Sequence, residues 1–198
     1  MAERVTRGAG LLEGFLARRR AAVARRLLRE CDHDGRILDV GCGSRPLFLR
    51  GSGFRERYGL DKLVAADRVD GDGIRLIHHD VRHQPRLPFD DASFDAVTML
   101  AVFEHIEPGP LAALLREIRR VLRPGARLVL TTPAGWTDPV LRTLARLRLV
   151  SPEEIDEHQD AYDHRVIRRF LTDAGFESDR IRTGSFELFM NIWATADA

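Results

Sequence analysis

An apolar run enters a glycine-rich turn early in the chain, in the sequence ILDVGCGSRP at residues 37–46. A strand that ends in such a turn is typical of doubly wound α/β sheets, whose ligands bind beyond the carboxyl ends of the strands. Gly41 and Gly43 let the backbone turn tightly and approach a ligand, and Asp39 can accept hydrogen bonds from the loop amides. Tight turns also use glycine for steric reasons alone, so a purely structural role stays open.

Short apolar runs alternate with helical stretches after this turn, which predicts parallel strands joined by right-handed crossovers. We expect buried strands at residues 36–40, 63–66, 74–77, 94–100 and 127–131. We expect helices at about residues 10–30, 110–122 and 163–174, the second ended by Arg123-Pro124-Gly125 and the third by Gly175. The stretches 180–186 and 188–195 indicate a closing antiparallel pair. The expected fold class is a doubly wound α/β sheet with helices on both faces.

The amino-acid composition is that of a folded protein, and its overall charge does not point to nucleic acid or a membrane as partner. The 198 residues can bury about 70% of the unfolded surface, and 44% hydrophobic residues argue against long disorder. A net charge of +1 gives no reason to expect nucleic acid or a membrane. Cys31 and Cys42 are too few for a disulfide framework. Glu13 interrupts the short apolar stretch near the start of the sequence, so this stretch does not match a secretory signal. No apolar run approaches the ~20 residues that a membrane-spanning helix needs. We therefore expect a cytoplasmic protein.

An aspartate ends the second expected strand, LVAAD. The carboxylate of Asp67 can accept hydrogen bonds from both hydroxyls of a ribose, and its charge disfavours a 2′-phosphate. A helix N-cap or turn role is the alternative for Asp67. Asp70 competes for the same ribose role.

The segment HHDV follows the third expected strand. Asp80 can accept a hydrogen bond from an adenine amino group while the Val81 amide donates to a ring nitrogen. His79 and His83 are four residues apart, but no further Cys or carboxylate completes a convincing ligand set, so no metal is expected.

The order of these segments resembles the class I S-adenosylmethionine-dependent methyltransferases, especially those acting on small molecules. The motifs are DVGCGSRP, LVAAD, HHDV, LPFDDASFDAVTMLAVFEHI and REIRRVLRPGARLVLTTP, which together span about half of the chain. The resemblance implies a Rossmann-like, mostly parallel sheet of seven strands with an antiparallel C-terminal strand. Where the family has a third glycine, this chain has Ser44-Arg45-Pro46, which leaves the shape of the loop open.

The resemblance also implies S-adenosylmethionine as cofactor, with S-adenosylhomocysteine as product. The implied cofactor contacts are Asp39, Gly41, Cys42, Gly43, Asp67, Arg68, Asp80, Val81, Leu100 and Ala101. We expect one domain, with a helical extension at 1–34, a cofactor-binding core at 35–133, and an acceptor-side insertion with C-terminal strands at 134–198.

Acceptor groups are expected after the fourth and fifth strands and in the C-terminal part. His105 is the first candidate for the general base because neutral imidazole accepts a proton near pH 7, with Glu104 beside it as a substrate contact. The alternative is that both residues only cap or orient the local backbone.

A second polar cluster lies further along the chain. His158 is a second candidate base and substrate contact, beside His164 and Tyr162, although a solvated helix entrance would have the same composition. Trp136 is expected in a loop that lines the acceptor pocket, whereas the aromatic residues of the closing strands are more often core.

The sequence thus predicts methyl transfer from S-adenosylmethionine to an oxygen, nitrogen or carbon atom of a small molecule, without a metal. A nicotinamide-dependent oxidoreductase on a similar sheet is the enzymatic alternative. A cofactor-binding module that serves a partner protein is the non-catalytic one. The run Arg18-Arg19-Arg20 is most simply a solvated helix face, with phosphate or an acidic partner as the other interpretation.

Overall fold

A single mixed sheet organises the computed structural model, which describes residues 13–135, 162–187 and 190–198. In these residues eight strands have the order β3-β4-β2-β1-β5-β6-β8-β7. The strands are β1 (Arg36–Val40), β2 (Glu56–Asp61), β3 (Arg68–Val69), β4 (Arg75–His78), β5 (Phe94–Leu100), β6 (Leu122–Pro133), β7 (Ile181–Phe186) and β8 (Asn191–Asp197). Strands β4, β2, β1, β5 and β6 are parallel, whereas β3, β8 and β7 each pair antiparallel to a neighbour.

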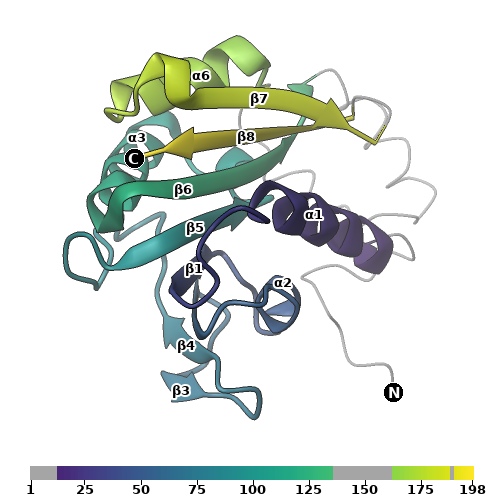
Figure 1. Cartoon of the computed structure of the whole chain (residues 1–198), viewed down its shortest axis with the longest axis vertical. Coiled ribbons are helices and arrows are strands. Elements are labelled where there is room, and N and C mark those ends of the chain that lie inside the picture. Colours follow the sequence, from purple (N-terminus) through teal and green to yellow (C-terminus); the bar gives the residue numbers. More distant parts are fainter. Residues whose placement is uncertain (1–12, 136–161, 188–189) are drawn as a thin grey trace.

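Helices cover both faces of this sheet (Figure 1). Helices α1 (Glu13–Leu27) and α2 (Leu47–Arg50) lie on one face, and α3 (Pro108–Val121) and α6 (His164–Asp173) lie on the other. Two short 3-10 turns, η1 (Phe103–His105) and η3 (Ser178–Arg180), complete the described elements. Each face buries its own cluster of apolar side chains, because parallel strands must be covered on both sides.

The expected fold class is confirmed, with one strand more than the expected seven. The additional strand is β3, a two-residue strand that pairs antiparallel with β4 at the margin of the sheet. The strands expected at 36–40 and 94–100 have the observed bounds of β1 and β5. Because β7 and β8 pair antiparallel, the C-terminal prediction also holds.

The second strand lies elsewhere than predicted. The apolar run at residues 63–66 is a turn and loop, and the strand beside β1 is β2, seven residues earlier. Val64 is fully buried without being in a strand, and its carbonyl accepts a hydrogen bond from the His78 ring at 2.6 Å. Gly59 sits in the middle of β2 because a Cβ there would lie 2.6 Å from the Cys42 sulfur. Because this strand has an interior glycine and few apolar residues, the pattern of apolar residues did not predict it.

The segment LPFDDASFD has a structural role in this fold. Arg120 of α3 donates to Glu117, to Asp91 and to the carbonyls of Leu87 and Phe89, so one guanidinium holds the whole loop before β5. These partners raise the pKa of Arg120, and its hydrogen bonds to Glu117 lower the pKa of that carboxyl.

None of the helices described is long and apolar enough to span a membrane.

Candidate active site

The glycine turn lies at the carboxyl end of β1, as predicted. Gly41 and Gly43 have φ values of +80° and +71°, in the left-handed region that favours glycine. The amides of Gly41 and Cys42 donate to the Leu60 carbonyl at 2.8 and 3.1 Å, which fixes the turn to the end of β2. A Cβ on Gly41 would lie 2.2 Å from a methyl group of Val102, so the segment after β5 also packs against this turn.

Asp61 is the acidic residue that ends β2, and the sequence analysis did not identify it. Its Oδ2 accepts from the Gly43 amide at 2.9 Å and its Oδ1 accepts from the Leu63 amide at 2.7 Å. The residue is 8% exposed. Asp61 therefore connects the glycine turn to the end of the neighbouring strand, in the position that had been expected for Asp67.

The premise for Asp67 as the ribose ligand is wrong, because Asp67 does not end a strand. It lies in the exposed loop before β3, and its Oδ1 accepts from the His78 amide at 2.8 Å. Asp70 stabilises the next turn by accepting from the amides of Asp72 and Ile74. Arg68 lies exposed in β3. These residues shape the loop around the site, and Asp61 is the carboxylate at the strand end.

A buried carboxyl lies directly beneath the turn. Asp39 is 4% exposed and accepts a hydrogen bond from the Thr98 hydroxyl of β5 at 2.6 Å. Burial raises the pKa of Asp39 to about 7, the Thr98 hydrogen bond opposes this, and the charge of Asp61 adds to it. Two carboxyl groups thus share one strand edge, which favours cationic ligands.

We expect Asp39→Asn to stabilise the cofactor-free protein above pH 7. A carboxyl whose pKa is higher in the folded chain than its usual 3.8 holds its proton more tightly when folded, so its contribution to stability declines as the pH rises from about 4 to about 7. Asparagine keeps an acceptor for Thr98 without that ionisation. Urea unfolding should show an advantage of about 3 kcal/mol for Asp39→Asn at pH 8 that fades towards pH 4. An advantage independent of pH would contradict this account.

Asp80 and Val81 follow β4, at the same edge of the sheet. The Asp80 carboxylate accepts from the Arg82 amide at 3.1 Å and lies 3.1 Å from Nδ1 of His83. Burial raises its pKa, but the hydrogen bonds from Arg82 and His83 outweigh burial and lower it to about 2. His79 instead contacts the Gln84 carbonyl. Within the described ranges, no three metal-binding side chains gather.

The chain turns sharply where β5 ends. Leu100 pairs with Thr131 of β6, and Ala101 has a φ of +55° while its amide donates to the Thr131 carbonyl at 2.9 Å. The η1 turn follows, with Glu104 only 3% exposed and His105 half-buried. Glu104 and His105 thus follow Val102, the residue that packs against Gly41 of the glycine turn. Strained backbone of this kind is concentrated at functional sites.

The conformation of Ala101 gives a second prediction. A β-branched residue is strongly disfavoured at positive φ, so Ala101→Val should lower the free energy of unfolding by about 1–2 kcal/mol. Ala101→Gly is the matched control and should leave stability within about 0.5 kcal/mol of the wild type. Urea denaturation of both variants measures the difference, and equal stability of the two would remove the argument for strain.

Tyr162 lies against η1 as a buried residue. It is 3% exposed, its ring packs edge-on against Phe103 at 4.7 Å, and its carbonyl accepts from the Gly135 amide at 3.0 Å. His164 begins α6, where its Nε2 lies 3.1 Å from the Ser185 hydroxyl. Trp136 and His158 lie outside the described residues.

Comparison with known proteins gives the family. Residues 12–180 match the model of the methyltransferase domain family. The chain belongs to the class I S-adenosylmethionine-dependent methyltransferases. Methyl transfer therefore replaces the nicotinamide-dependent alternative, and S-adenosylmethionine is the cofactor of this methyltransferase.

Curated relatives and a solved structure extend the match. Demethylmenaquinone methyltransferase of Staphylococcus saprophyticus is 29% identical over 174 residues, or 75% of this chain and 72% of that protein. The 2-phytyl-1,4-naphtoquinone methyltransferase of Nostoc punctiforme is 32% identical over 129 residues, or 58% of this chain and 53% of that protein. Four curated relatives are matched over 36% to 53% of their own length. A protein solved in complex with the Trm112 methyltransferase activator of Haloferax volcanii has a TM-score of 0.71 at 19% identity, over 93% of this chain and 92% of that one.

The residues at the strand edge fit this cofactor. A Cβ on Gly43 would meet only the Arg45 amide nitrogen, at 3.9 Å, so the turn has room at this position for a close ligand. Asp39 and Asp61 are carboxyl groups at this edge, and carboxyl groups are suitable hydrogen-bond acceptors for the ammonium group of this cofactor. When bound, the cofactor supplies a methyl group that a nucleophile displaces in line from sulfur.

Proposed function

We propose that this methyltransferase acts on a small aromatic alcohol of the hydroquinone type, bound beside η1 with His105 as general base. The observation that carries the proposal is the turn after β5, where a buried carboxyl and a half-buried imidazole are adjacent in sequence and follow a left-handed residue. A base in this position removes the hydroxyl proton as the oxygen, or a ring carbon that shares its electrons, attacks the methyl group.

Different residues are proposed to bind the ribose and the adenine of the cofactor. Asp61 is proposed for the ribose hydroxyls in place of Asp67, because its carboxylate lies where β2 ends and next to the glycine turn. Asp80 and Val81 are proposed for the adenine edge, since they follow β4 at the same side of the sheet. Asp39 lies under the turn and is held there by its hydrogen bond from the Thr98 hydroxyl.

Aromatic surroundings support the acceptor class. Phe103, Tyr162 and Phe170 form an edge-to-face cluster with ring centroids 4.7 to 6.2 Å apart, and Phe103 is part of η1 itself. Three of the relatives are named as demethylmenaquinone or 2-phytyl-1,4-naphtoquinone methyltransferases, which supports a quinone-derived acceptor here. Trp136 and His158 remain proposed acceptor contacts.

Labelled cofactor provides the test. The chain is incubated with S-adenosylmethionine carrying an isotopic methyl group and with separate panels of hydroquinones, aliphatic alcohols and amines, and products are identified by mass spectrometry. We expect the label in the hydroquinone panel. Label only in amines would overturn the acceptor class. Cofactor binding by calorimetry with no product in any panel would favour the non-catalytic binding module instead.

A further inference from the structure

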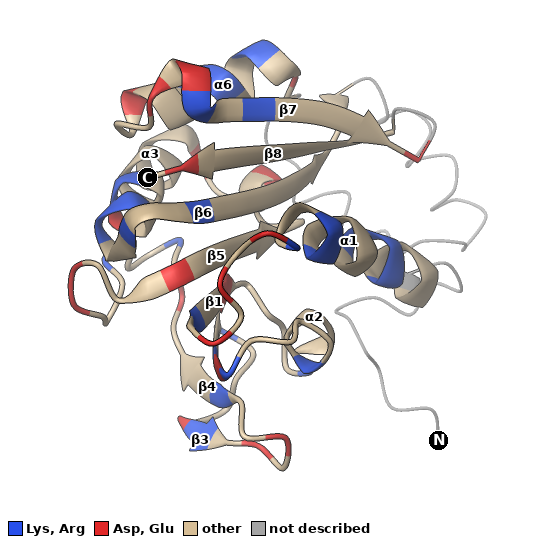
Figure 2. Ribbon diagram, viewed as in Figure 1, with Lys and Arg blue, Asp and Glu red and all other residues tan. Residues whose placement is uncertain are grey.

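The exposed face of α1 has an unusual composition. Between residues 14 and 27, the exposed positions are Phe15, Arg18, Arg19, Ala22, Arg25 and Arg26. They recur every three or four residues and therefore form one stripe along the helix, roughly 16 Å long at 1.5 Å per residue. The stripe contains no carboxylate, and α1 and its arginines stand out at one side of the molecule in Figure 2.

The arginines of this stripe differ in their pairing from three arginines of the sheet and of α3. Arg120, Arg123 and Arg127 each hold a carboxylate at 2.5 to 2.7 Å. On α1, only Arg19 of the stripe approaches a carboxylate in the described part of the chain, with Nε 3.7 Å from Glu187. Arg18, Arg25 and Arg26 form no ion pair with any described residue. Their charge is therefore available to an external partner.

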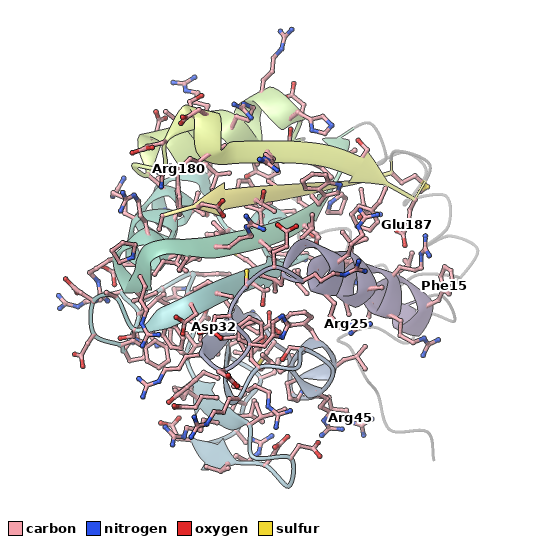
Figure 3. The ribbon with its side chains drawn as sticks, in the orientation of Figure 1. Phe15, Arg25, Asp32, Arg45, Arg180 and Glu187 are labelled. Atoms are coloured by element: carbon pink, nitrogen blue, oxygen red, sulfur yellow. The ribbon has the colours of Figure 1, made fainter. Side chains whose placement is uncertain are left out.

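Phe15 adds an apolar group to the same stripe. Its side chain is 52% exposed, and it is the aromatic residue among the exposed large hydrophobic side chains of the described chain. Figure 3 shows Phe15 at the N-terminal end of α1 and Arg25 further along the same helix. An aromatic ring flanked by unpaired arginines is complementary to a phospholipid interface, where arginines meet the headgroup phosphates and the ring enters the acyl boundary.

The stripe lies close to the edge of the sheet that carries the active site. Arg19 reaches Glu187, which directly follows β7. The neighbouring residue Phe186 pairs with Asn191, and Asn191 pairs with Pro133 at the carboxyl end of β6. The N-terminal half of α1 is thus next to the strand ends that face the acceptor. A bilayer that binds this stripe would therefore lie next to the carboxyl end of β6.

We propose that the exposed stripe of α1 docks this methyltransferase on an anionic phospholipid bilayer, next to its active site. The overall net charge of +1 does not reveal this surface, because arginine is the only charged residue type in the stripe while the acidic residues lie outside it. The docking surface leaves the apolar side of α1 in the core, where Ala21, Ala24 and Leu28 are buried. The inference concerns this surface alone and does not depend on which acceptor is methylated.

Vesicle sedimentation of the full chain tests the proposal. Vesicles of equal parts phosphatidylglycerol and phosphatidylcholine are compared with vesicles of phosphatidylcholine alone, at about 0.1 M and about 1 M salt. We expect binding only to the anionic vesicles, and loss of binding at the higher salt concentration. Binding that is indifferent to phosphatidylglycerol, or no binding at low salt, would overturn the proposal.

Matched variants locate the surface. The triple variant Arg18→Gln, Arg25→Gln, Arg26→Gln should bind anionic vesicles about 100-fold more weakly, as expected for three basic side chains at an anionic surface. The control variant Arg55→Gln, Arg86→Gln, Arg116→Gln removes the same charge from exposed positions outside α1 and should bind within about threefold of the wild type. Equal losses in the two variants would overturn the assignment to α1.

The variant Phe15→Ala distinguishes binding to a bilayer from binding to other polyanions. It should weaken vesicle binding about fivefold, since the ring no longer enters the acyl boundary, and should not change binding to a single-stranded RNA oligonucleotide. Tighter binding to the RNA than to the vesicles at equal phosphate concentration would indicate a nucleic-acid surface and would overturn the proposal. Calorimetry with S-adenosylmethionine confirms that each variant is folded, because none of the substituted residues belongs to the cofactor site.

Discussion

Replacement of Asp61 by alanine is expected to weaken binding of S-adenosylmethionine by about 30-fold to 1000-fold, or about 2–4 kcal/mol. The substitution removes the acceptor of the Gly43 and Leu63 amides and, under the proposed function, the acceptor of the ribose hydroxyls. Hydrogen bonds to a charged acceptor contribute about twice as much as neutral ones, so the loss of several exceeds that of an ordinary contact. Isothermal calorimetry measures the effect.

Asp67→Ala is the matched control for this prediction. Asp67 is exposed and bonds the His78 amide, so its loss should loosen a surface loop and change cofactor affinity less than about threefold. If Asp67→Ala weakened binding as much as Asp61→Ala does, the loop before β3 would be part of the ribose site. Thermal unfolding of both variants separates lost affinity from lost structure.

Replacement of His105 by alanine should lower kcat about 10²-fold to 10⁴-fold with a hydroxyl acceptor, and should leave cofactor affinity nearly unchanged. The imidazole lies in the η1 turn after β5, where it is half-buried beside Glu104, whereas the residues proposed to hold the cofactor lie at the ends of β1, β2 and β4. Steady-state kinetics with an acceptor found in the hydroquinone panel, together with calorimetry, measures the two effects separately.

His164→Ala is the comparison for His105. Its imidazole lies at the start of α6 within 3.1 Å of the Ser185 hydroxyl, so we expect this variant to keep more than half of the wild-type kcat. His105→Ala with a kcat above half of the wild-type value would exclude His105 as the base. Attention would then turn to His158.

The sequence predicted those parts of the site that depend on strong local patterns. Gly41 and Gly43 directly follow the buried strand β1, and both have the positive φ that their residue type favours. Five of the seven residues of β5 are apolar, and this strand was predicted with its observed bounds. In these cases the local preference and the tertiary structure agree.

Asp61 could not be identified by the same reasoning, because its strand is determined by tertiary contacts. β2 contains three charged residues, Glu56, Arg57 and Asp61, as well as Gly59, and this glycine is required by the approach of Cys42 from a neighbouring loop. The apolar run after it is buried as a loop, with Val64 in the core. The spacing of apolar residues indicates which residues are buried. Here the apolar run at residues 63–66 lies in a loop, whereas the neighbouring segment β2 forms the strand. The left-handed conformation of Ala101 likewise has no local signal, since alanine does not favour it.

The packing of Cys42 against Gly59 has a consequence for the survival of the enzyme during turnover. Sulfur is a good nucleophile only as the thiolate, and a thiolate beside an alkylating cofactor would consume it and inactivate the protein. Burial, together with the charges of Asp39 and Asp61, raises the pKa of the Cys42 thiol, which donates to the Gly43 carbonyl at 3.3 Å. Because Gly59 of β2 has no side chain, the Cys42 sulfur can pack against it in a buried position, where the protonated thiol is favoured. Under the proposed function, the loop can therefore carry a cysteine near the methyl donor without being alkylated by it.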